Sequence, residues 1–273
     1  MKKFITLFFT LLINTPSIIL STDAYKKFVI LIPSYNNEQY AEGTILSALQ
    51  DYPEDCYRII FVDDCSRDKT LISTENAVAR SGKSHLVTII HNYERKGALR
   101  NLYETINNYT ADEEIIAILD GDDQLANKNV LTLLNDVYSN QNVWLTYGQF
   151  KHSSNNNPGF CQPMPESTVE NNAFRQWPHG ASHLKTFYSK LFKNIKREDL
   201  MIKNSFFEMC YDLAIMFPML EQANDRFKFI PEVLYIYNDI NPISDHRKSR
   251  ALQRNLDLYI RALPCYSRLD RLF

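Results

Sequence analysis

The stretch FVILIPSYNNEQY, from Phe28 to Tyr40, decides the fold, because a continuous apolar run ends abruptly in polar residues. Such a run is typical of a strand buried on both faces of a parallel sheet. Four more apolar runs follow, at Tyr57–Val62, Leu86–Ile90, Glu114–Leu119 and Val143–Tyr147. Helical patterns separate the runs, at Glu38–Leu49, Lys69–Arg80, Ala98–Asn107 and Val130–Tyr138. This alternation predicts an α/β fold with a mainly parallel sheet flanked by helices.

The second half of the chain follows a different pattern. The segment His152–Glu170 is polar and rich in Asn, Ser and Pro, which predicts a long loop. We expect helices at Leu184–Ile195 and Leu213–Gln222, followed by the apolar stretch Phe227–Tyr237. The sequence thus divides into residues 1–24, 25–150, 151–240 and a basic tail, 241–273.

Composition and charge limit the possible functions. The chain has 273 residues, 45% of them apolar and 23% charged, which fits one large globular domain. Its net charge is 30 − 32 = −2, so a protein held on nucleic-acid phosphates is excluded. The charge is unevenly distributed, because residues 246–273 contain seven Lys or Arg against two Asp. The five cysteines are scattered without a CxxC pair, which argues against a disulfide framework or a zinc site.

The N-terminus has the features of a targeting segment. Two lysines, Lys2 and Lys3, precede the mostly apolar run Phe4–Leu20, which Asn14 and Pro16 interrupt. A cleaved signal peptide, a signal anchor and a buried N-terminal helix all fit this pattern. Either of the first two predicts an exported or membrane-associated protein, in a secretory lumen or at a membrane surface.

Polar residues gather where the predicted strands end. Asp63 and Asp64 follow one strand, and Asp120-Gly121-Asp122-Asp123 follows another. Ligands of parallel sheets bind at the carboxyl ends of the strands, so these carboxylates are expected to share a site. Such a cluster needs hydrogen-bond donors or a cation, and oxygen ligands favour Mg²⁺ or Mn²⁺. Helix caps and ordinary turns are the alternative explanation for each motif alone.

Taken in order, these motifs resemble those of the glycosyltransferase family 2 enzymes, which have the nucleotide-sugar-binding GT-A fold. The specific matches are VILIPSYNNEQY (Val29–Tyr40), IIFVDDCSRDKT (Ile59–Thr70), NYERKGALRN (Asn92–Asn101) and ILDGDDQL (Ile118–Leu125). Looser matches are YDLAIMFPMLE (Tyr211–Glu221) and FIPEVLYIYN (Phe229–Asn238). The resemblance implies a single GT-A (Rossmann-like) domain. Residues 25–150 would bind the nucleotide-sugar, and residues 151–240 would hold the acceptor and the catalytic base.

The resemblance also implies which residues bind the nucleotide. The end of the first strand, at Pro33, Ser34 and Tyr35, would line the base pocket. Asp64 or its neighbour Asp63 would accept a hydrogen bond from a base N–H, typically of uracil. Arg100 and Asn101 match a stretch that lies near the nucleotide.

The family's DxD motif corresponds here to Asp120-Gly121-Asp122. By resemblance, Asp120 would face the ribose and Asp122 would bind a divalent cation, Mn²⁺ or Mg²⁺, with Asp123 as a further candidate ligand. His246 occupies the position of a late metal ligand in some relatives. Arg247 and Lys248 are candidates to close over the diphosphate. A solvated helix face, or a surface attracted to anionic lipid, is the alternative for this basic tail.

The implied reaction is transfer of one sugar, with inversion, from a nucleotide-sugar, UDP-linked in the prediction. The acceptor is a hydroxyl of a glycan, lipid or protein. Asp212 matches the catalytic base, and a helix N-cap is its alternative role. Many members carry a Glu-Asp pair there, whereas this chain has Cys210-Tyr211-Asp212, with Glu208 one turn earlier, so the base assignment stays open. The QxxRW motif of processive members is missing after Asp212, which favours addition of a single sugar.

Two other functions remain open from the sequence. One is a catalytically silent relative that binds a glycan or a partner, and the other is a nucleotidyltransferase on a similar sheet. His183 is a candidate contact to sugar or acceptor, with simple packing as the alternative. A sugar-stacking platform or the core would account for the remaining aromatic candidates, Trp144, Trp177, Tyr235 and Tyr237.

Overall fold

The structure is a computed structural model that describes residues 25–139, 142–178, 180–243 and 249–273. The predicted targeting segment and the candidates His246, Arg247 and Lys248 lie outside these residues, so those predictions stay predictions. Within the described part of the chain, every helix is too short or too polar to cross a membrane.

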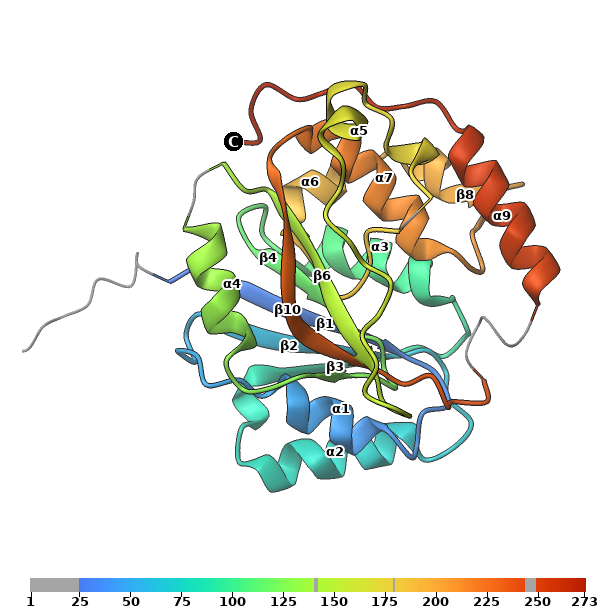
Figure 1. Cartoon of the computed structure of the whole chain (residues 1–273). Coiled ribbons are helices and arrows are strands. Elements are labelled where there is room, and N and C mark those ends of the chain that lie inside the picture. Colours follow the sequence, from blue (N-terminus) through green and yellow to red (C-terminus); the bar gives the residue numbers. More distant parts are fainter. Residues whose placement is uncertain (1–24, 140–141, 179, 244–248) are drawn as a thin grey trace, which may run out of the picture.

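An eight-stranded sheet in the order β3-β2-β1-β4-β7-β6-β10-β5 forms the centre of the molecule (Figure 1). Its strands are β1 (Phe28–Ser34), β2 (Tyr57–Asp63), β3 (Val87–His91), β4 (Ile115–Ile118), β5 (Gln124–Leu125), β6 (Leu145–His152), β7 (Lys185–Tyr188) and β10 (Phe227–Tyr237). A separate hairpin pairs β8 (Met201–Ile202) with β9 (Ser205–Phe206). All five strands predicted in the first half of the chain are confirmed.

The predicted parallel arrangement is also confirmed for most of the sheet. Strand β1 pairs in parallel with β2 and β4, so that Phe28 is opposite both Tyr57 and Ile115. Strands β2 and β3, and β6 and β10, are parallel as well. Antiparallel pairs join β7 to β4 and β6, and β5 to β10. The sheet therefore aligns the carboxyl ends of β1, β2 and β4 at one edge.

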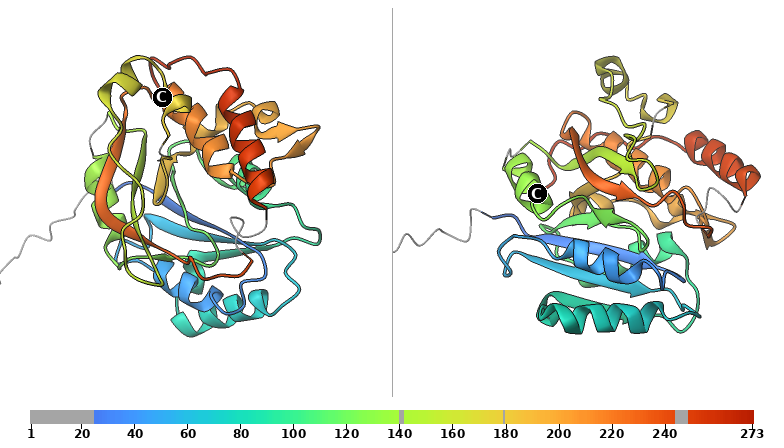
Figure 2. Two further views of the ribbon diagram at one scale, coloured as in Figure 1. Left: turned by 45° about the vertical axis from the view of Figure 1, so that its right-hand side comes forward. Right: turned by 60° about the horizontal axis from the view of Figure 1, so that its bottom comes forward.

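Helices cover both faces of the sheet and create two apolar cores (Figure 2). One face packs against α1 (Ala41–Ala48), α2 (Thr70–Ser81) and α4 (Val130–Tyr138). The other packs against α3 (Ala98–Tyr109), α6 (Ser189–Lys193), α7 (Tyr211–Ala223) and α9 (Arg250–Ala262). Neighbouring residues of β1 enter opposite cores, Phe28 and Ile30 one and Val29 and Leu31 the other, as strand alternation requires. The described residues also form a short α5 (Glu166–Glu170) and 3₁₀ turns at Ser84–Leu86, Phe174–Gln176 and Arg197–Leu200.

The predicted helix Leu184–Ile195 is wrong in its first half. Lys185–Tyr188 forms strand β7, and α6 begins only at Ser189. The strand fits between β4 and β6, where the Thr186 hydroxyl pairs with the hydroxyls of Thr146 (2.6 Å) and Tyr138 (2.9 Å). The predicted loop His152–Glu170 is mostly irregular, but β6 extends into its first residue and α5 forms its end.

A buried ion pair clamps the end of α7. Two of the three guanidinium nitrogens of Arg175, Nε and Nη2, donate to the carboxylate of Glu221 at 2.6 and 3.0 Å. The third nitrogen of Arg175 donates to the carbonyl of Ile260 in α9, and the Tyr266 N–H donates to Glu221. The clamp thereby ties the last turn of α7 to the C-terminal segment.

Candidate active site

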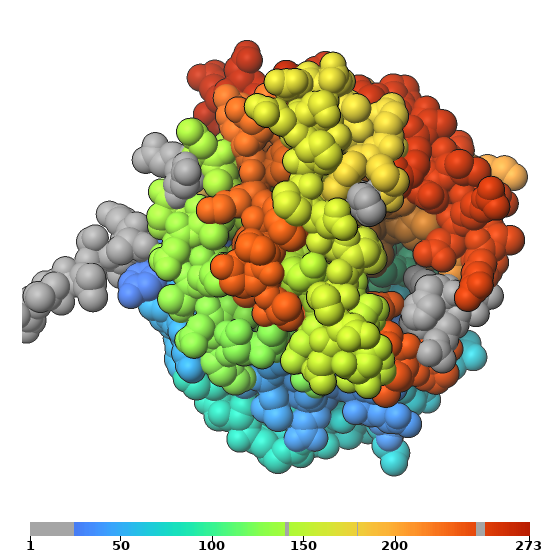
Figure 3. Space-filling model, in the orientation of Figure 1, coloured from blue at the N-terminus to red at the C-terminus, as the bar shows by residue number. Residues whose placement is uncertain are grey.

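A cavity of about 570 Å³ opens at the carboxyl ends of β1 and β4. The face in Figure 3 is hollowed between the yellow segment that follows β6 and the red helix α9. Most of the predicted site residues that the structure describes line this cavity, namely Pro33, Ser34, Tyr35, Asp64, Asp120, Asp122, Asp123 and Asp212. Asp63 and Arg100 lie outside its lining. One cavity thus collects residues from both halves of the chain.

Glycine is required in the middle of the acidic motif because two strand ends meet there. The Gly121 N–H donates to the carbonyl of Pro33 at 3.1 Å, which extends the pairing of β4 with β1. A Cβ on Gly121 would come within 2.4 Å of the Ser34 hydroxyl and 2.8 Å of the Ser34 Cα. The Thr44 hydroxyl of α1 donates to the carbonyls of Gly121 and Asp123 and holds the turn from below. The carboxylates of this turn are therefore held beside Ser34.

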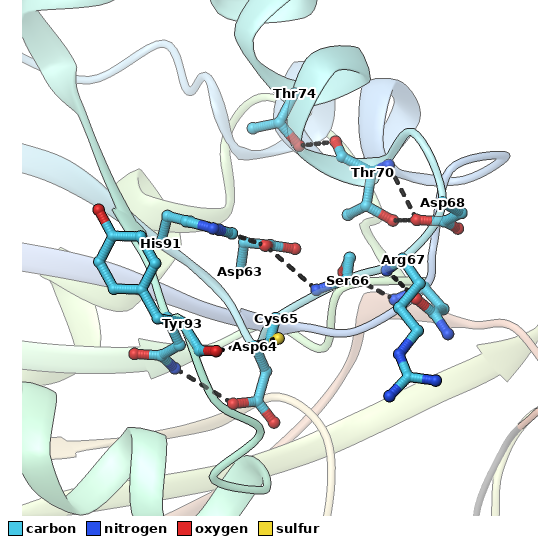
Figure 4. A network of polar contacts seen from close by, with 12 residues as sticks. Asp63, Asp64, Cys65, Ser66, Arg67, Asp68, Thr70, Thr74, His91 and Tyr93 are labelled. Carbon is cyan, nitrogen blue, oxygen red and sulfur yellow. Dashed lines mark hydrogen bonds and ion pairs between the residues drawn. The ribbon is translucent and has the colours of Figure 1, made fainter.

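The two adjacent aspartates at the end of β2, Asp63 and Asp64, point in different directions (Figure 4). One oxygen of Asp63 pairs with His91 Nδ1 at 2.8 Å and accepts the Ser66 N–H at 3.3 Å. Asp64 accepts the backbone N–H groups of Lys96 and Gly97, both at 2.8 Å, and the side-chain amide of Asn92 at 3.1 Å. Gly97 has φ +84°, so a glycine suits this donor. Of the two predicted base contacts, Asp64 faces the cavity.

Arg95 and Arg100 differ in their relation to the predicted base pocket. The Arg95 guanidinium lies 4.1 Å from the centre of the Tyr35 ring, and both residues line the cavity. Arg100, by contrast, pairs with Glu104 one turn along α3 at 2.7 Å. Hydrogen bonding to Glu104 outweighs partial burial and raises the pKa of Arg100. The predicted contact of Arg100 with the nucleotide stays a prediction.

The acidic turn after β4 concentrates negative charge in a buried place. Burial, together with Asp212 and Asp122, raises the pKa of Asp120 to about 6, although Lys185 opposes the shift. Burial, Asp122 and Asp120 raise the pKa of Asp123 well above its usual range. The turn therefore holds more carboxylate charge than its protein surroundings stabilise.

Each carboxylate of the turn has its own partners. Asp120 Oδ1 accepts the Tyr211 hydroxyl at 2.6 Å. The two oxygens of Asp123 accept the Tyr235 hydroxyl and the Asn238 N–H, both at 2.6 Å. These bonds give Asp123 an inward, structural place, and its metal-ligand role stays a prediction. Asp122, which is only partly buried, accepts the Asn241 amide at 2.6 Å.

Metal ligands are not gathered into a complete protein set here. Among the described residues, no group of three or more His, Cys, Asp and Glu side chains is arranged to hold a metal ion. The candidate ligand His246 lies outside those residues. A cation at Asp122 would therefore take its other ligands from elsewhere, such as diphosphate and water oxygens.

Asp212 lies in the first turn of α7 and is paired with a buried lysine. Its carboxylate accepts a short hydrogen bond from Lys185 Nζ, and the side chain remains 34% exposed. Burial alone would raise the pKa of Asp212, but the charge and hydrogen bond of Lys185 hold it below the usual range. The helix N-cap is Cys210, with no side-chain cap, so Asp212 does not play the alternative N-cap role.

Sequence analysis missed several residues that organise this site. Lys185, Tyr211 and Asn241 hold the carboxylates of Asp212, Asp120 and Asp122. Tyr235, for which sugar stacking and the core were the two alternatives, is buried in the core, and its hydroxyl holds Asp123. Trp144 and Trp177 belong to the core, whereas His183 and Tyr237 line the cavity. A tyrosine directly before Asp212 was the only visible signal, because it stands where many relatives have an acid.

An acidic turn and a separate aspartate at the strand-end cavity of a mainly parallel sheet define the GT-A class of glycosyltransferases. The family model described as Glycosyl transferase family 2 matches residues 29–196, which is more than half of the chain. The chain therefore belongs to glycosyltransferase family 2. The predicted family, the GT-A fold and, at the level of the family, the prediction of a glycosyltransferase are confirmed.

Individual relatives are similar over shorter or more divergent stretches. A 46-residue segment is 44% identical to the poly(ribitol-phosphate) beta-N-acetylglucosaminyltransferase TarS of Staphylococcus aureus, covering 16% of this chain and 8% of that protein. The structure of S. aureus TarS 1-349 with UDP-GlcNAc is similar with a TM-score of 0.59 at 19% identity, covering 82% of this chain and 61% of that one. The mannosyltransferase PcManGT of Pyrobaculum calidifontis, in complex with GDP-Man and Mn²⁺, gives 0.58 at 18% identity, covering 89% and 66%. At these identities, the structural likeness shows the fold.

Proposed function

We propose that this protein transfers one sugar from a nucleotide-sugar donor to an acceptor hydroxyl, with inversion at the anomeric carbon. The observation that carries the proposal is the hydrogen bond from Tyr211 to Asp120, at 2.6 Å. It joins the acidic DxD turn to the first turn of α7, so that Asp212 lies in the same cavity as the predicted nucleotide contacts. The proposed donor site and the candidate base therefore line the same cavity.

The donor is proposed to be UDP-linked. Asp64 offers a carboxylate at the end of the pocket formed by Pro33, Ser34 and Tyr35, where it would accept the N3–H of uracil. The similar TarS structures contain UDP-GlcNAc and UDP, which supports this choice. The other similar enzyme contains GDP-Man, so guanine donors are the alternative to test.

The proposed step balances as follows. Asp212 takes the proton of the acceptor hydroxyl while its oxygen forms a bond to C1 of the sugar. The bond between C1 and the diphosphate oxygen breaks on the opposite face, and its electron pair leaves with the nucleoside diphosphate. Lys185 keeps Asp212 ionised, which is the state that a general base requires.

A divalent cation fits the charge of the site. The raised pKa values of Asp120 and Asp123 show carboxylate charge that the surrounding protein leaves only partly stabilised. Asp122 is the carboxylate proposed to hold the cation, since it lines the cavity and is only partly buried, whereas Asp123 is buried against Tyr235 and Asn238. When bound, a cation of this kind neutralises charge on the leaving diphosphate.

The test combines binding and turnover. The whole protein is incubated with UDP-GlcNAc, UDP-Glc, UDP-Gal or GDP-Man and Mn²⁺, and release of nucleoside diphosphate is measured with water or a glycan as acceptor. Asp212→Asn should lower turnover by about 10²–10⁴-fold, because the base is lost, while calorimetry finds donor binding unchanged. Asp122→Asn should instead remove the dependence on Mn²⁺.

The control is Asp136→Asn, on the exposed side of α4 and away from the cavity. It makes the same chemical change and should behave as wild type. Turnover of Asp212→Asn equal to that of the control would refute the mechanism. If no donor binds with either Mn²⁺ or Mg²⁺, the catalytically silent relative is the better description. Retention of the donor's anomeric configuration in the product, seen by NMR, would refute inversion.

A further inference from the structure

Lys185 is an unusual residue because its side chain is fully buried in the middle of the sheet, with 0% exposure. Its ammonium has three N–H groups, and each has a neighbour. One donates to Asp212, one points to His183 Nδ1 at 3.2 Å, and the Tyr211 ring centre lies 5.1 Å away. A buried lysine is costly unless it is paired, so these contacts explain how the strand accommodates the charge.

The pair is asymmetric in its exposure. Lys185 is closed off from solvent on β7, whereas Asp212 keeps a third of its side chain open to the cavity. The Lys185 ammonium donates to Oδ1 of Asp212. The ammonium therefore fixes the carboxylate from behind, on the side opposite to the space that an acceptor would occupy.

We propose that Lys185 is a positioning residue, which grips one oxygen of Asp212 and so presents the carboxylate, ionised, to the acceptor hydroxyl. This inference rests on the proposed function, in which Asp212 is the base. It adds a second consequence for His183. Because an ammonium can only donate, His183 Nδ1 must accept, and the ring proton then lies on Nε2. His183 becomes a neutral hydrogen-bond donor in the cavity wall.

The surrounding charges agree with this role. The groups around Asp212 are Lys185 and His183 on or beside β7, Tyr211 on α7, Asp120 after β4, Tyr237 in the cavity lining, and the buried thiol of Cys161. Lys185 is the fixed cation among them. Burial, then Lys185, lowers the pKa of His183 to about 3, so this ring stays neutral at physiological pH. Without Lys185, burial and the nearby Asp120 would both favour protonated Asp212.

The decisive experiment is the pH profile of kcat/KM for Lys185→Met in the whole protein. Removal of an opposite charge at contact distance should move the acid limb to higher pH by about one unit or more. Turnover should therefore fall most at pH 6 and recover in part at pH 8.5, with donor binding within threefold of wild type. The control is Lys190→Met, which removes a partly exposed lysine of α6 that lies 3.9 Å from Asp112. An acid limb that stays in place in Lys185→Met would overturn the inference.

Two further measurements keep the inference testable if Lys185→Met folds poorly. Lys185→Arg retains the charge but changes its geometry, so kcat should fall while the acid limb stays where it is in wild type; a limb that moves would count against the inference. In an Asp212→Asn background, Lys185→Arg should add little to the loss of turnover, because Lys185 acts through Asp212. Full additivity of the two losses would contradict this route.

A readout without turnover separates this inference from the proposed function. Nitrogen NMR of the His183 ring should show the Nε2–H tautomer in wild type, neutral down to about pH 4, and a higher pKa in Lys185→Met. The Nδ1–H tautomer would refute the proposed position of the Lys185 ammonium between His183 and Asp212, whether or not the protein transfers sugar. Lack of turnover with every donor, together with the Nε2–H tautomer, would refute the proposed function and leave the contact intact.

Discussion

Asp64 and Asp123 are both buried carboxylates at strand ends of one sheet, with 3% and 1% exposure, yet their surroundings differ. Asp64 accepts three N–H groups, two of them from the backbone of Lys96 and Gly97. Asp123 accepts two donors but also faces Asp122 and Asp120, and its pKa is raised well above the usual range. The fold therefore gives Asp64 enough hydrogen-bond donors, whereas it leaves Asp123 beside other carboxylates with too few.

The difference teaches how one sheet edge can serve two ends of a nucleotide-sugar. Backbone donors have fixed positions, so they hold the Asp64 carboxylate in one orientation. A carboxylate held in this way can select a nucleotide base by its hydrogen-bonding pattern. The excess negative charge around Asp123 is stabilised only when a cation binds nearby. Neutral isosteres at the two positions should therefore act in opposite directions.

The largest effect is expected for Asp64→Asn. An amide has one acceptor oxygen and two N–H groups, so at least one backbone donor of Lys96 or Gly97 would face another donor. Unfolding by urea should show a loss of about 3 kcal/mol relative to wild type. Asp136→Asn provides the exposed control, with a change below about 0.5 kcal/mol. Equal stability of the two variants would break the comparison.

An intermediate effect is expected for Gly121→Ala, which tests whether the acidic turn is fixed by its contact with Ser34. The new Cβ would lie 2.4 Å from the Ser34 hydroxyl, so the strand ends must separate. A loss of about 2 kcal/mol should follow, together with weaker donor binding. Gly180→Ala is a matched control, since its Cβ would meet only the Phe160 ring, at 3.7 Å. If both variants unfold at the same urea concentration, the close approach is unimportant.

The smallest effect, and one of opposite sign, is expected for Asp123→Asn in metal-free buffer. Because the folded protein raises the pKa of Asp123, the folded state binds its proton more tightly than the unfolded state does. Wild type should therefore lose stability as pH rises through that raised pKa, and the variant should lose less. At pH 7.5 the variant should be stabilised by up to about 1 kcal/mol, and at pH 4 the gain should vanish. Destabilisation as large as that of Asp64→Asn would contradict the comparison.

Much of this site was predictable because parallel strands align their carboxyl ends. The apolar runs that end at Pro33, Val62 and Leu119 were enough to bring Ser34, Asp64 and Asp120 to one edge. Which of two adjacent aspartates faces the cavity was not predictable. Strand alternation sends Asp63 and Asp64 to different sides, but only the packed helices determine which side contains the cavity.

Lys185 shows the limit of sequence-based prediction most clearly. A lysine at the first position of the four-residue strand β7 argues against a buried strand, because lysines are almost always exposed. Its partner Asp212 lies 27 residues away, a separation that no local pattern relates. The sequence pattern therefore gave no sign of β7, where a helix was predicted, or of the ion pair behind the predicted base.

The clamp between Arg175 and Glu221 has a mechanical consequence for the other end of α7. A helix of 13 residues is a rod of about 20 Å, with Asp212 in its first turn and Glu221 in its last. Glu221 and Asp212 are nine residues apart, or about 13 Å along the helix axis. Angular play of about 5° at Glu221 would displace Asp212 by about 1.2 Å, and a misplacement of that size can lower a catalytic rate by about 10²-fold. We therefore expect the clamp of Arg175 on Glu221 to align the proposed base from the opposite end of the helix.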